Sequence, residues 1–261
     1  MIELPSTDFP SAKVLLNHHQ SGAEIVGAVL AGHTKGRVFL RSVADLTVGF
    51  IYNNGFCAFS GSVADEKFAR LCLNWLVRQS EQDFFILYPG NKSWGQALDI
   101  VGGESVNKVG RIAYRFKESL FDGASFQPPL GEEFRLARMD AALMATAADT
   151  VYPWARGLWK SEAHFERNGI GFCVLKDDRI ASLCYSVFVS GLHHEIDILT
   201  VGSLRRSGLA RAIAIAYIRE CLDQNLEPGW NCFAENLASR KLAECLGFVP
   251  IDEFFVYAWQ R

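Results

Sequence analysis

The chain has 261 residues, 49% of them hydrophobic and 21% charged, which is typical of a soluble globular protein. Its net charge of −3 gives no basic surface for nucleic acid, and its longest apolar run, near residues 25–31, is too short to span a bilayer. Glu3 and Asp8 stand where a signal peptide would be basic and then apolar, so we expect a cytoplasmic protein with no nucleic-acid or membrane partner.

The seven cysteines indicate a reduced protein without a metal site. Their number is odd, none forms a Cys-x-x-Cys pair, and most stand in apolar surroundings, where a free cysteine behaves as a small hydrophobic residue. Histidines are paired at 18–19 and 193–194. Neighbouring residues of a strand point to opposite faces, so we expect neither pair to bind one metal ion.

The first half predicts a small α/β domain over residues 1–125. Helices are expected at 12–16, 23–31 and 62–78, and strands at 37–41, 47–52, 56–59, 84–88 and 111–116. Asn53-Asn54-Gly55 predicts a hairpin turn, because Asn and Gly tolerate positive φ. Glycine, serine and two prolines gather between Phe121 and Gly131, so this segment predicts a linker to a second domain over 131–261.

The second half has a clearer pattern. Strands are expected at 134–136, 171–176, 180–189, 193–200, 230–234 and 248–259, and helices at 140–147, from about 209 to 223, and at 236–246. Asp140 is a predicted N-cap, Asp177-Asp178 a predicted hairpin turn, and Glu227-Pro228-Gly229 a predicted turn. Gly247 is expected to end its helix at the C′ position.

One junction carries most of the functional information. Arg205-Arg206-Ser207-Gly208-Leu209-Ala210 lies between the strand at 193–200 and the long helix that follows. A helix start presents unpaired N–H groups and the positive end of its dipole, and a glycine there lets an anion approach the backbone closely. The segment therefore predicts a site for a phosphate or pyrophosphate.

The pattern Arg-x-x-Gly-x-Ala resembles the acyl-CoA-binding signature of the GNAT N-acetyltransferase superfamily. A second GNAT-like feature follows in the family's order: Asn236-Leu237-Ala238-Ser239 opens a helix that Leu246-Gly247-Phe248 closes. The resemblance implies a mixed, largely antiparallel sheet flanked by helices in the second half, behind a smaller α/β first half, for which a degenerate GNAT-like domain is one interpretation. The whole layout also resembles the zwittermicin-resistance acetyltransferases.

The resemblance implies acetyl-CoA as co-substrate and assigns residues to it. Backbone N–H groups from Arg206 to Ala210 would hold the pyrophosphate, with Arg205 and Arg206 adding charge. The pantetheine arm would lie along the strand end Ile198-Leu199-Thr200. Asn236 and Ser239 match positions that contact the CoA arm, and Asn236 can also be a plain N-cap.

Glu195 and Asp197 are the candidate bases, since positions i and i+2 share a strand face. Their proximity would raise one pKa, and we prefer Glu195, although either carboxylate could instead be structural or attract a cationic substrate. The tyrosine acid common in GNAT enzymes is missing, because its position holds Ala243. Tyr257 and Cys232 are possible neighbours of the leaving thiolate, with Cys232 better explained as a core residue.

The favoured function is transfer of an acetyl group from acetyl-CoA to the primary amine of a small molecule by direct attack. The alternative is an inactive GNAT domain that binds acyl-CoA as a sensor or scaffold. Three roles are open for the first half. It would cover the acceptor site, be a decayed duplicate of the second half, or mediate dimerisation. Four aromatic residues are candidates for the acceptor pocket, with core packing the better explanation of each: Trp154, Trp159, Phe165 and Phe172.

Overall fold

The structure is a computed structural model that describes residues 1–17, 19–79, 84–103, 106–123 and 130–260. The chain divides into two compact units, Met1–Arg111 with Glu253–Arg261, and Ile112–Asp252. The division predicted from sequence, 1–125 and 131–261, stays a prediction, and the middle of its linker, 124–129, lies outside the described residues, as does His18. The chain passes from the first unit to the second inside strand β6 (Asn107–Phe116) and returns inside strand β12 (Phe248–Gln260).

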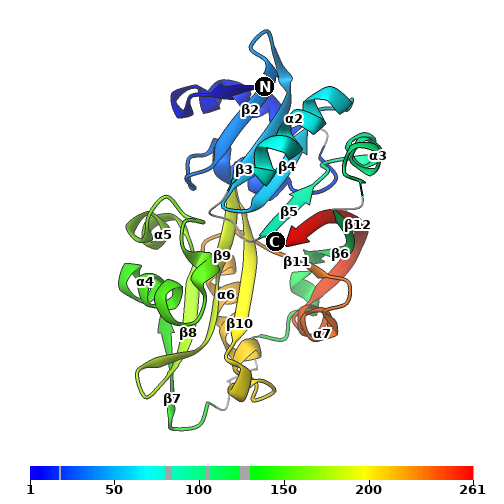
Figure 1. The fold of residues 1–261 in the computed structure, drawn as a ribbon. Coiled ribbons are helices and arrows are strands. Elements are labelled where there is room, and N and C mark those ends of the chain that lie inside the picture. Colours follow the sequence, from blue (N-terminus) through cyan, green and yellow to red (C-terminus); the bar gives the residue numbers. More distant parts are fainter. Residues whose placement is uncertain (18, 80–83, 104–105, 124–129, 261) are drawn as a thin grey trace. The chain divides into compact units, whose positions relative to one another are not determined.

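The first unit combines helices with strands that form a sheet (Figure 1). Its helical segments are η1 (Ser6–Leu16), α1 (Ala23–Leu30), α2 (Glu66–Val77) and α3 (Lys92–Val101). Its strands are β1 (Ile2–Leu4), β2 (Arg37–Ser42), β3 (Asp45–Asn53), β4 (Phe56–Ser60), β5 (Phe84–Tyr88) and the first part of β6 (Asn107–Phe116).

The second unit is built in the same way. Its α-helices are α4 (Ala141–Thr150), α5 (Glu162–Asn168), α6 (Leu209–Asp223) and α7 (Leu237–Cys245), and short 3-10 turns are η3 (Glu118–Leu120), η4 (Pro153–Ala155) and η5 (Gly202–Leu204). Its strands are β7 (Phe134–Arg138), β8 (Gly171–Lys176), β9 (Arg179–Ser190), β10 (His193–Thr200), β11 (Glu227–Phe233) and the first part of β12 (Phe248–Gln260).

The fold is a mixed α/β fold with mostly antiparallel strands, as the sequence predicts. In the first unit the strand order is β1-β2-β3-β4-β5-β12-β6, and in the second it is β7-β8-β9-β10-β11-β6-β12. Each unit has a parallel pair at the same place in this order, β4 with β5 and β10 with β11, each joined through a crossover helix.

The two units repeat one order of elements. From β1 to β6 the order is strand, two helical segments, three strands, helix, strand, helix and strand. From β7 to β12 the strands and α-helices follow the same order, with the short 3-10 turns η4 and η5 added. Under this correspondence α2 matches α6, α3 matches α7, and β4–β5 matches β10–β11. In each strand order, the last strand of the other half takes the sixth place. Because of this repeat, each element of the second unit can be compared with its counterpart in the first.

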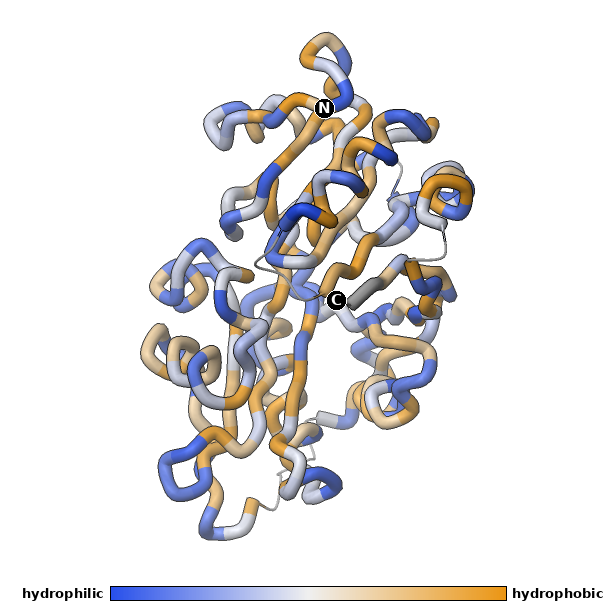
Figure 2. The backbone as a smooth tube through the Cα atoms, viewed as in Figure 1, coloured by the Kyte–Doolittle hydropathy of each residue, from blue (hydrophilic) through white to orange (hydrophobic). Residues whose placement is uncertain are grey.

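Each unit has its own apolar core, and the strands carry most of the apolar sequence (Figure 2). The core of the first unit is rich in aromatic residues, including Phe50, Phe59 and Trp94. The core of the second unit gathers around α6, where Leu209, Ala212, Ile213 and Tyr217 are buried as the helical spacing predicts. Burying one such side chain is worth roughly 1.5–3 kcal/mol, so α6 is held firmly in place behind its N-terminus.

Turn and cap residues behave largely as the sequence predicts. Asn54 and Gly55 both have positive φ between the paired residues Asn53 and Phe56, which confirms the hairpin. Asp177 and Asp178 form the second predicted hairpin in the same way. Asp140 caps α4 by accepting from the Leu143 N–H at 2.8 Å, and Gly247 ends α7 with φ +87°.

The turn predicted at Glu227-Pro228-Gly229 is wrong, because these residues begin β11 and pair with His193, His194 and Glu195 of β10. A Pro-Gly pair usually marks a turn, but here Pro228 stands in the first residues of the strand, where proline is tolerated. This difference matters for function, since it brings Gly229 beside Glu195.

Candidate active site in the second unit

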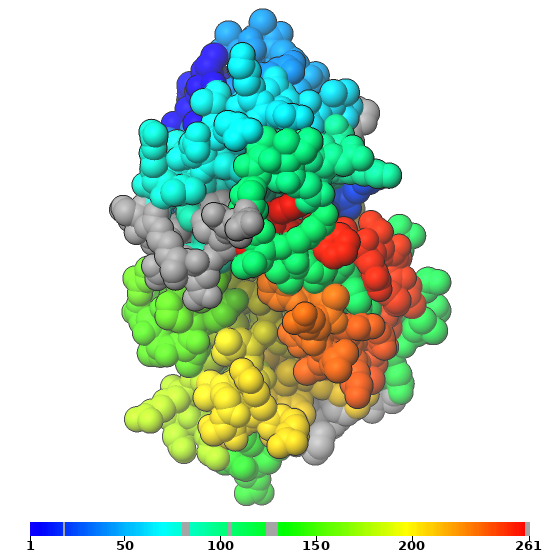
Figure 3. Space-filling view, turned by 45° about the vertical axis from the view of Figure 1, so that its right-hand side comes forward, coloured from blue at the N-terminus to red at the C-terminus, as the bar shows by residue number. Residues whose placement is uncertain are grey.

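The junction before α6 is an open helix start. Gly208 is the N-cap residue with φ +84°, and among the described residues no side chain caps the helix and no atom lies within 4 Å of the place a Cβ would take. The four residues from Arg205 to Gly208 are exposed, and the segment after residue 200 lies on the surface of the second unit in yellow (Figure 3). The first N–H groups of α6 therefore face solvent.

Arginines surround this helix start. Arg205 and Arg206 precede it, Arg211 stands in the first turn, and Arg206 adopts the left-handed φ of +66°. A positive side chain at the positive end of a helix dipole is unfavourable, by about 0.3–1 kcal/mol for each charge. A bound anion would reverse the sign of that effect. Backbone N–H groups at a helix start and arginine side chains are the groups that phosphate sites use, and a phosphate site here stays a prediction.

Strands β10 and β11 diverge towards this helix start. They pair in parallel from His193 with Glu227 to Glu195 with Gly229, but β10 continues to Thr200 and β11 to Phe233. The register of β9 with β10 shifts between Glu195 and Ile196, where the divergence begins. The strand end predicted to hold pantetheine, Ile198 to Thr200, stays paired with β9 but lies beyond the last residues that pair with β11.

Asn236 and Ser239 open α7, and both already have partners in the protein. The Asn236 side-chain oxygen accepts from the Ser239 N–H at 3.1 Å, as an N-cap does. The Ser239 hydroxyl accepts from the Trp230 indole N–H at 3.1 Å, and Trp230 belongs to β11. These bonds fix α7 on the strand that borders the divergence, and a contact of either residue with CoA stays a prediction.

Glu195 is buried at the point where the strands separate, with only 5% of its surface exposed. The Asn231 side-chain N–H donates to its Oε1 at 2.7 Å, and the His193 Nε2 lies 3.0 Å from its Oε2. Gly229 makes room for this group, because a Cβ there would lie 2.2 Å from His193 Nε2 and 2.4 Å from Glu195 Oε2. Sequence reasoning named Glu195 but missed His193, Asn231 and Gly229.

Asp197 has a different environment. The Tyr152 hydroxyl, from the segment after α4, donates to its Oδ2 at 2.6 Å. Burial and the Asp197 charge raise the pKa of the Tyr152 phenol, so this hydroxyl stays protonated near neutral pH. Tyr185 is paired with Asp197 across β9 and β10 and is fully buried, and its burial together with the Asp197 charge raises the pKa of its phenol. The two candidate bases are thus held by separate groups.

The comparisons with known proteins decide the family. A model of the GNAT acetyltransferase family matches residues 14–257, which is most of the chain. The chain belongs to the GNAT acetyltransferase family. It is 29% identical over 173 residues to YdfB of Bacillus subtilis, described as an uncharacterized N-acetyltransferase, and the match spans 66% of this chain and 65% of that relative. The chain therefore covers about two thirds of the length of this relative.

Solved GNAT structures share the fold along the whole chain. A GCN5-related N-acetyltransferase-like protein from Streptococcus suis has a TM-score of 0.75 and 24% identity, over 98% of this chain and 99% of its own. A tandem GNAT protein from the clavulanic acid biosynthesis pathway has a TM-score of 0.64 and 11% identity, over 99% and 97% of the two chains. These likenesses concern the fold alone, and they include both units.

At the position where many GNAT enzymes carry a tyrosine as general acid, this chain has Ala243. Ala243 is fully buried in the core of the second unit, and Cys232 is a buried core residue as well. Tyr257 is occupied in the first unit, where its hydroxyl lies 2.6 Å from the Asp99 carboxylate and 2.8 Å from the Gly95 carbonyl. The suggestion that Tyr257 neighbours the thiolate therefore has no support.

The aromatic candidates for an acceptor pocket mostly pack in the core. Trp159 and Phe165 are buried and meet edge to face at 5.4 Å, and Phe172 packs against the main core cluster. Trp154 alone of the four is exposed, at 41%. Phe165 also contacts Tyr185 edge to face at 6.2 Å, so the core aromatics support the tyrosine beside Asp197.

In the described part of the chain, no group of three or more His, Cys, Asp or Glu residues is arranged to hold a metal ion. None of the described helices has the length and apolar character needed to cross a membrane. His193 and His194 have separate partners, since His194 Nδ1 lies 3.1 Å from the Ser186 hydroxyl.

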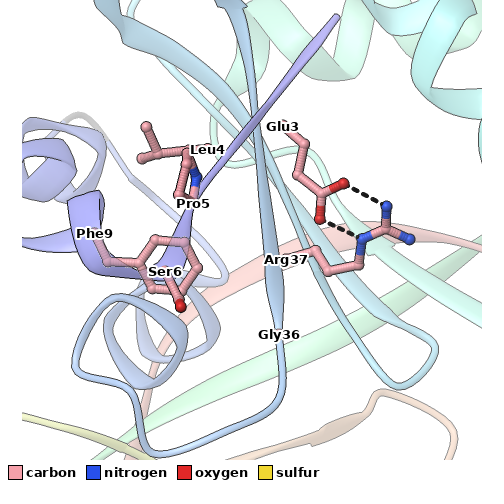
Figure 4. Close-up of a pocket in the computed structure, with 7 residues that line it drawn as sticks. All are labelled: Glu3, Leu4, Pro5, Ser6, Phe9, Gly36 and Arg37. Atoms are coloured by element: carbon pink, nitrogen blue, oxygen red, sulfur yellow. Dashed lines mark hydrogen bonds and ion pairs between the residues drawn. The ribbon is translucent and has the colours of Figure 1, made fainter.

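A hollow of about 400 Å³ in the first unit does not resemble the GNAT site. It is lined by residues of β1, η1 and β2, and Glu3 and Arg37 form a two-bond ion pair at its edge, at 2.6 and 2.7 Å (Figure 4). The Arg37 guanidinium lowers the pKa of the Glu3 carboxyl. Both charges are part-exposed and satisfied by each other, so this ion pair leaves neither of them unpaired to recognise a ligand.

Proposed function

We propose that this GNAT protein transfers an acetyl group from acetyl-CoA to the primary amine of a small molecule, at a site in the second unit. The observation that carries the proposal is the open, arginine-flanked start of α6 beside the divergence of β10 and β11. A pyrophosphate fits the start of α6. An extended pantetheine arm with its amides fits the place where β10 and β11 diverge. A buried carboxylate, Glu195, stands where the two strands separate.

The proposed reaction is direct attack of the amine on the thioester. The substrate ammonium gives one proton to a base, and the neutral amine forms a C–N bond with the thioester carbon. The C–S bond breaks, and the second N–H proton goes to the CoA thiolate. Since a thiol has a pKa of about 8.5, the thiolate is a tolerable leaving group without a dedicated acid. The buried Ala243 is compatible with this mechanism.

Glu195 is the preferred base, and Asp197 has a role in positioning the acceptor. The Asp197 carboxylate already accepts a bond from the Tyr152 hydroxyl, whose pKa is raised by burial, so Tyr152 is a donor and not a base. We propose that Asp197 and Tyr152 form the wall against which the substrate ammonium docks, and that Glu195 removes its proton.

We also propose that the first unit is a second copy of the GNAT fold without a CoA site, on the strength of the repeated order of elements. One acetyl-CoA would then bind per chain. A role of this unit in a homodimer, and the narrower likeness to the zwittermicin-resistance acetyltransferases, stay predictions.

The alternative function is a GNAT domain that binds acyl-CoA as a sensor or scaffold without turnover. The absence of a tyrosine at Ala243 is the observation that favours it. Release of CoA, followed with a thiol reagent over a panel of small primary amines, separates the two. Turnover with at least one amine supports the enzyme, and acetyl-CoA binding without turnover on any amine supports the sensor. A protein that binds no acetyl-CoA contradicts both.

A further inference from the structure

We propose that Tyr217 is a positioning residue for the reaction, and that it holds the main chain of β10 at Glu195 through a buried cluster with Ser186 and His194. The inference rests on the proposed function, in which Glu195 is the base. Its starting observation is that the Tyr217 hydroxyl donates to the His194 carbonyl at 3.3 Å. That carbonyl belongs to the peptide group that joins His194 to Glu195.

The three residues of this cluster form a closed set of contacts. The Tyr217 oxygen lies 2.8 Å from the Ser186 hydroxyl, and the Ser186 hydroxyl lies 3.1 Å from His194 Nδ1. The cluster therefore holds His194 by both its main chain and its imidazole. Ser186 and Tyr217 are fully buried, and His194 is 4% exposed. Burial raises the pKa of the Tyr217 phenol, so the hydroxyl keeps its proton and stays a donor.

Ser186 is itself held by neighbouring segments. Its N–H donates to the Ile170 carbonyl at 2.8 Å, and its carbonyl accepts from the Trp159 indole N–H at 2.9 Å. Its hydroxyl oxygen also accepts from the Ile170 N–H at 3.1 Å. These bonds leave Ser186 little freedom to move, so the contact with Ser186 also fixes the place of the Tyr217 hydroxyl.

The cluster lies where the strand pairing is irregular. The register of β9 with β10 shifts directly after Glu195, which pairs with Phe188, while Ile196 pairs with Ser186. At such a shift the ladder is locally disrupted, so the pairing alone fixes the main chain less firmly. The Tyr217 hydroxyl adds a constraint from α6, which packs against both strands (Figure 1).

The Glu195 carboxylate is held separately from the Glu195 main chain. Asn231 donates to its Oε1 at 2.7 Å, and His193 Nε2 lies 3.0 Å from its Oε2. A general base has to lie within hydrogen-bond reach of the proton that it removes, so a small shift of the main chain at Glu195 would lower the rate. Tyr217 is fully buried in the core around α6, so it acts through Glu195 and not on the substrate.

The first unit shows that the fold does not need such a cluster. Its matching strands β3 and β4 pair without a register shift, from Gly49 with Ser60 to Asn53 with Phe56. The core there joins these strands to α2 through apolar groups, which include Phe50, Phe59, Phe68, Cys72 and Leu76. Burying polar groups costs free energy unless they are hydrogen-bonded, and an apolar core avoids that cost. The cluster and the register shift therefore occur together, in the unit that contains the candidate base.

The test compares Tyr217→Phe with the wild type in the full-length protein. The variant keeps the aromatic ring and removes only the hydroxyl, so the core stays filled. We expect kcat on an accepted amine to fall by about tenfold, because a hydrogen bond is lost and its buried partner is left unpaired. The KM and Kd for acetyl-CoA should change by less than about twofold. Tyr88→Phe, at a tyrosine that is 2% exposed in the first unit, is the matched control and should keep the wild-type rate.

A double-variant cycle separates positioning from a general effect on the fold. If Tyr217 acts through Glu195, the same change made in Glu195→Gln should lower the remaining rate by less than about twofold, because the group that Tyr217 positions is already lost. A further tenfold loss in the double variant would overturn the proposal. A full rate in Tyr217→Phe would overturn it as well.

Amide hydrogen exchange tests the contact without a substrate. The amides of residues 194–197 should exchange faster in Tyr217→Phe than in the wild type, while those of β3 in the first unit should not change. Unchanged exchange at 194–197 would show that Tyr217 does not hold β10, and it would overturn the proposal. A wild type that acetylates no amine would overturn the proposed function, and the exchange result would still decide whether Tyr217 holds β10.

Discussion

Helices α2 and α6 hold the same place in the two units, yet they start in opposite ways. α6 begins at Gly208 with no capping side chain and with arginines around it. α2 begins at Asp65, whose carboxylate accepts from the Phe68 N–H at 2.8 Å and lies 3.5 Å from Arg41. The first helix thus carries its own anion at the place where the second leaves room for one.

The strands beside these helices also differ, because the strand of the second unit extends further beyond its parallel pairing than the strand of the first. β10 runs five residues beyond its last pairing with β11, whereas β4 pairs with β5 up to Ala58 and ends at Ser60. In the first unit Trp94 of α3 packs beside the end of β4, where it is fully buried, stacks on Phe59 at 4.5 Å and donates to the Gly61 carbonyl at 3.0 Å. One fold therefore gives an open site in one unit and a closed core in the other.

The largest expected effect comes from placing a carboxylate at the start of α6, as α2 has. Gly208→Glu should weaken acetyl-CoA binding by about 100-fold or more, roughly 2.7 kcal/mol, because the carboxylate occupies the phosphate position. Gly208→Ala is the control, since it carries the same left-handed strain of about 1–2 kcal/mol without the charge. Calorimetric titration of both variants measures the difference. Tight binding by a folded Gly208→Glu protein would contradict the assignment of the site.

The next effect concerns the base. Glu195→Gln should lower kcat by about 10²- to 10⁴-fold, because general base catalysis is lost, and change acetyl-CoA affinity by less than about threefold. Steady-state kinetics and calorimetry on the same preparation check both numbers. Asp197→Asn should raise the KM for the amine more than it lowers kcat. An unchanged rate in Glu195→Gln would move the base to Asp197 or to water.

A smaller effect is expected from the arginines. Arg205→Ala and Arg206→Ala should each weaken acetyl-CoA binding by about tenfold, the value of one charge-assisted contact. The loss should shrink as salt is raised, because exposed charges are screened within about 10 Å at 0.1 M salt. Binding measured at several ionic strengths tests this, with Arg70→Ala on α2 as control. Equal affinity in the single variants and the wild type at low salt would leave the arginines without a role.

The smallest expected effect concerns the start of α2 in the first unit. Asp65→Ala removes the cap of α2 and should reduce the free energy of unfolding by about 1 kcal/mol, within the usual range of 0.5–2 kcal/mol. Acetyl-CoA affinity should stay at the wild-type value. Urea denaturation and calorimetry measure the two quantities. A loss of acetyl-CoA affinity in this variant would mean that the first unit contributes to binding.

Much of the candidate CoA site could be predicted from sequence because it consists of local features. A glycine at a strand-to-helix junction, two arginines before it and an asparagine N-cap 28 residues after Gly208 are all read along the chain. Helix α6 and its buried face follow from spacing in the same way. Each of these features depends on residues no more than a few positions apart.

The partners of the two candidate carboxylates could not be predicted, because they meet across the fold. Asn231 reaches Glu195 from 36 positions away, and Tyr152 reaches Asp197 from 45. Gly229 was misread as part of a turn, although its role is to leave space beside Glu195. His193 gave the one local signal, since its spacing of two from Glu195 on a strand puts both on one face. The shared strands β6 and β12 are equally beyond local pattern.

The most direct test of the account is the number of acetyl-CoA molecules bound by the wild-type chain, measured by isothermal titration calorimetry. One site per chain is predicted, because α6 offers an open helix start and α2 is closed by Asp65 and Trp94. Two sites per chain, or no binding at all, would contradict the division of roles between the two units.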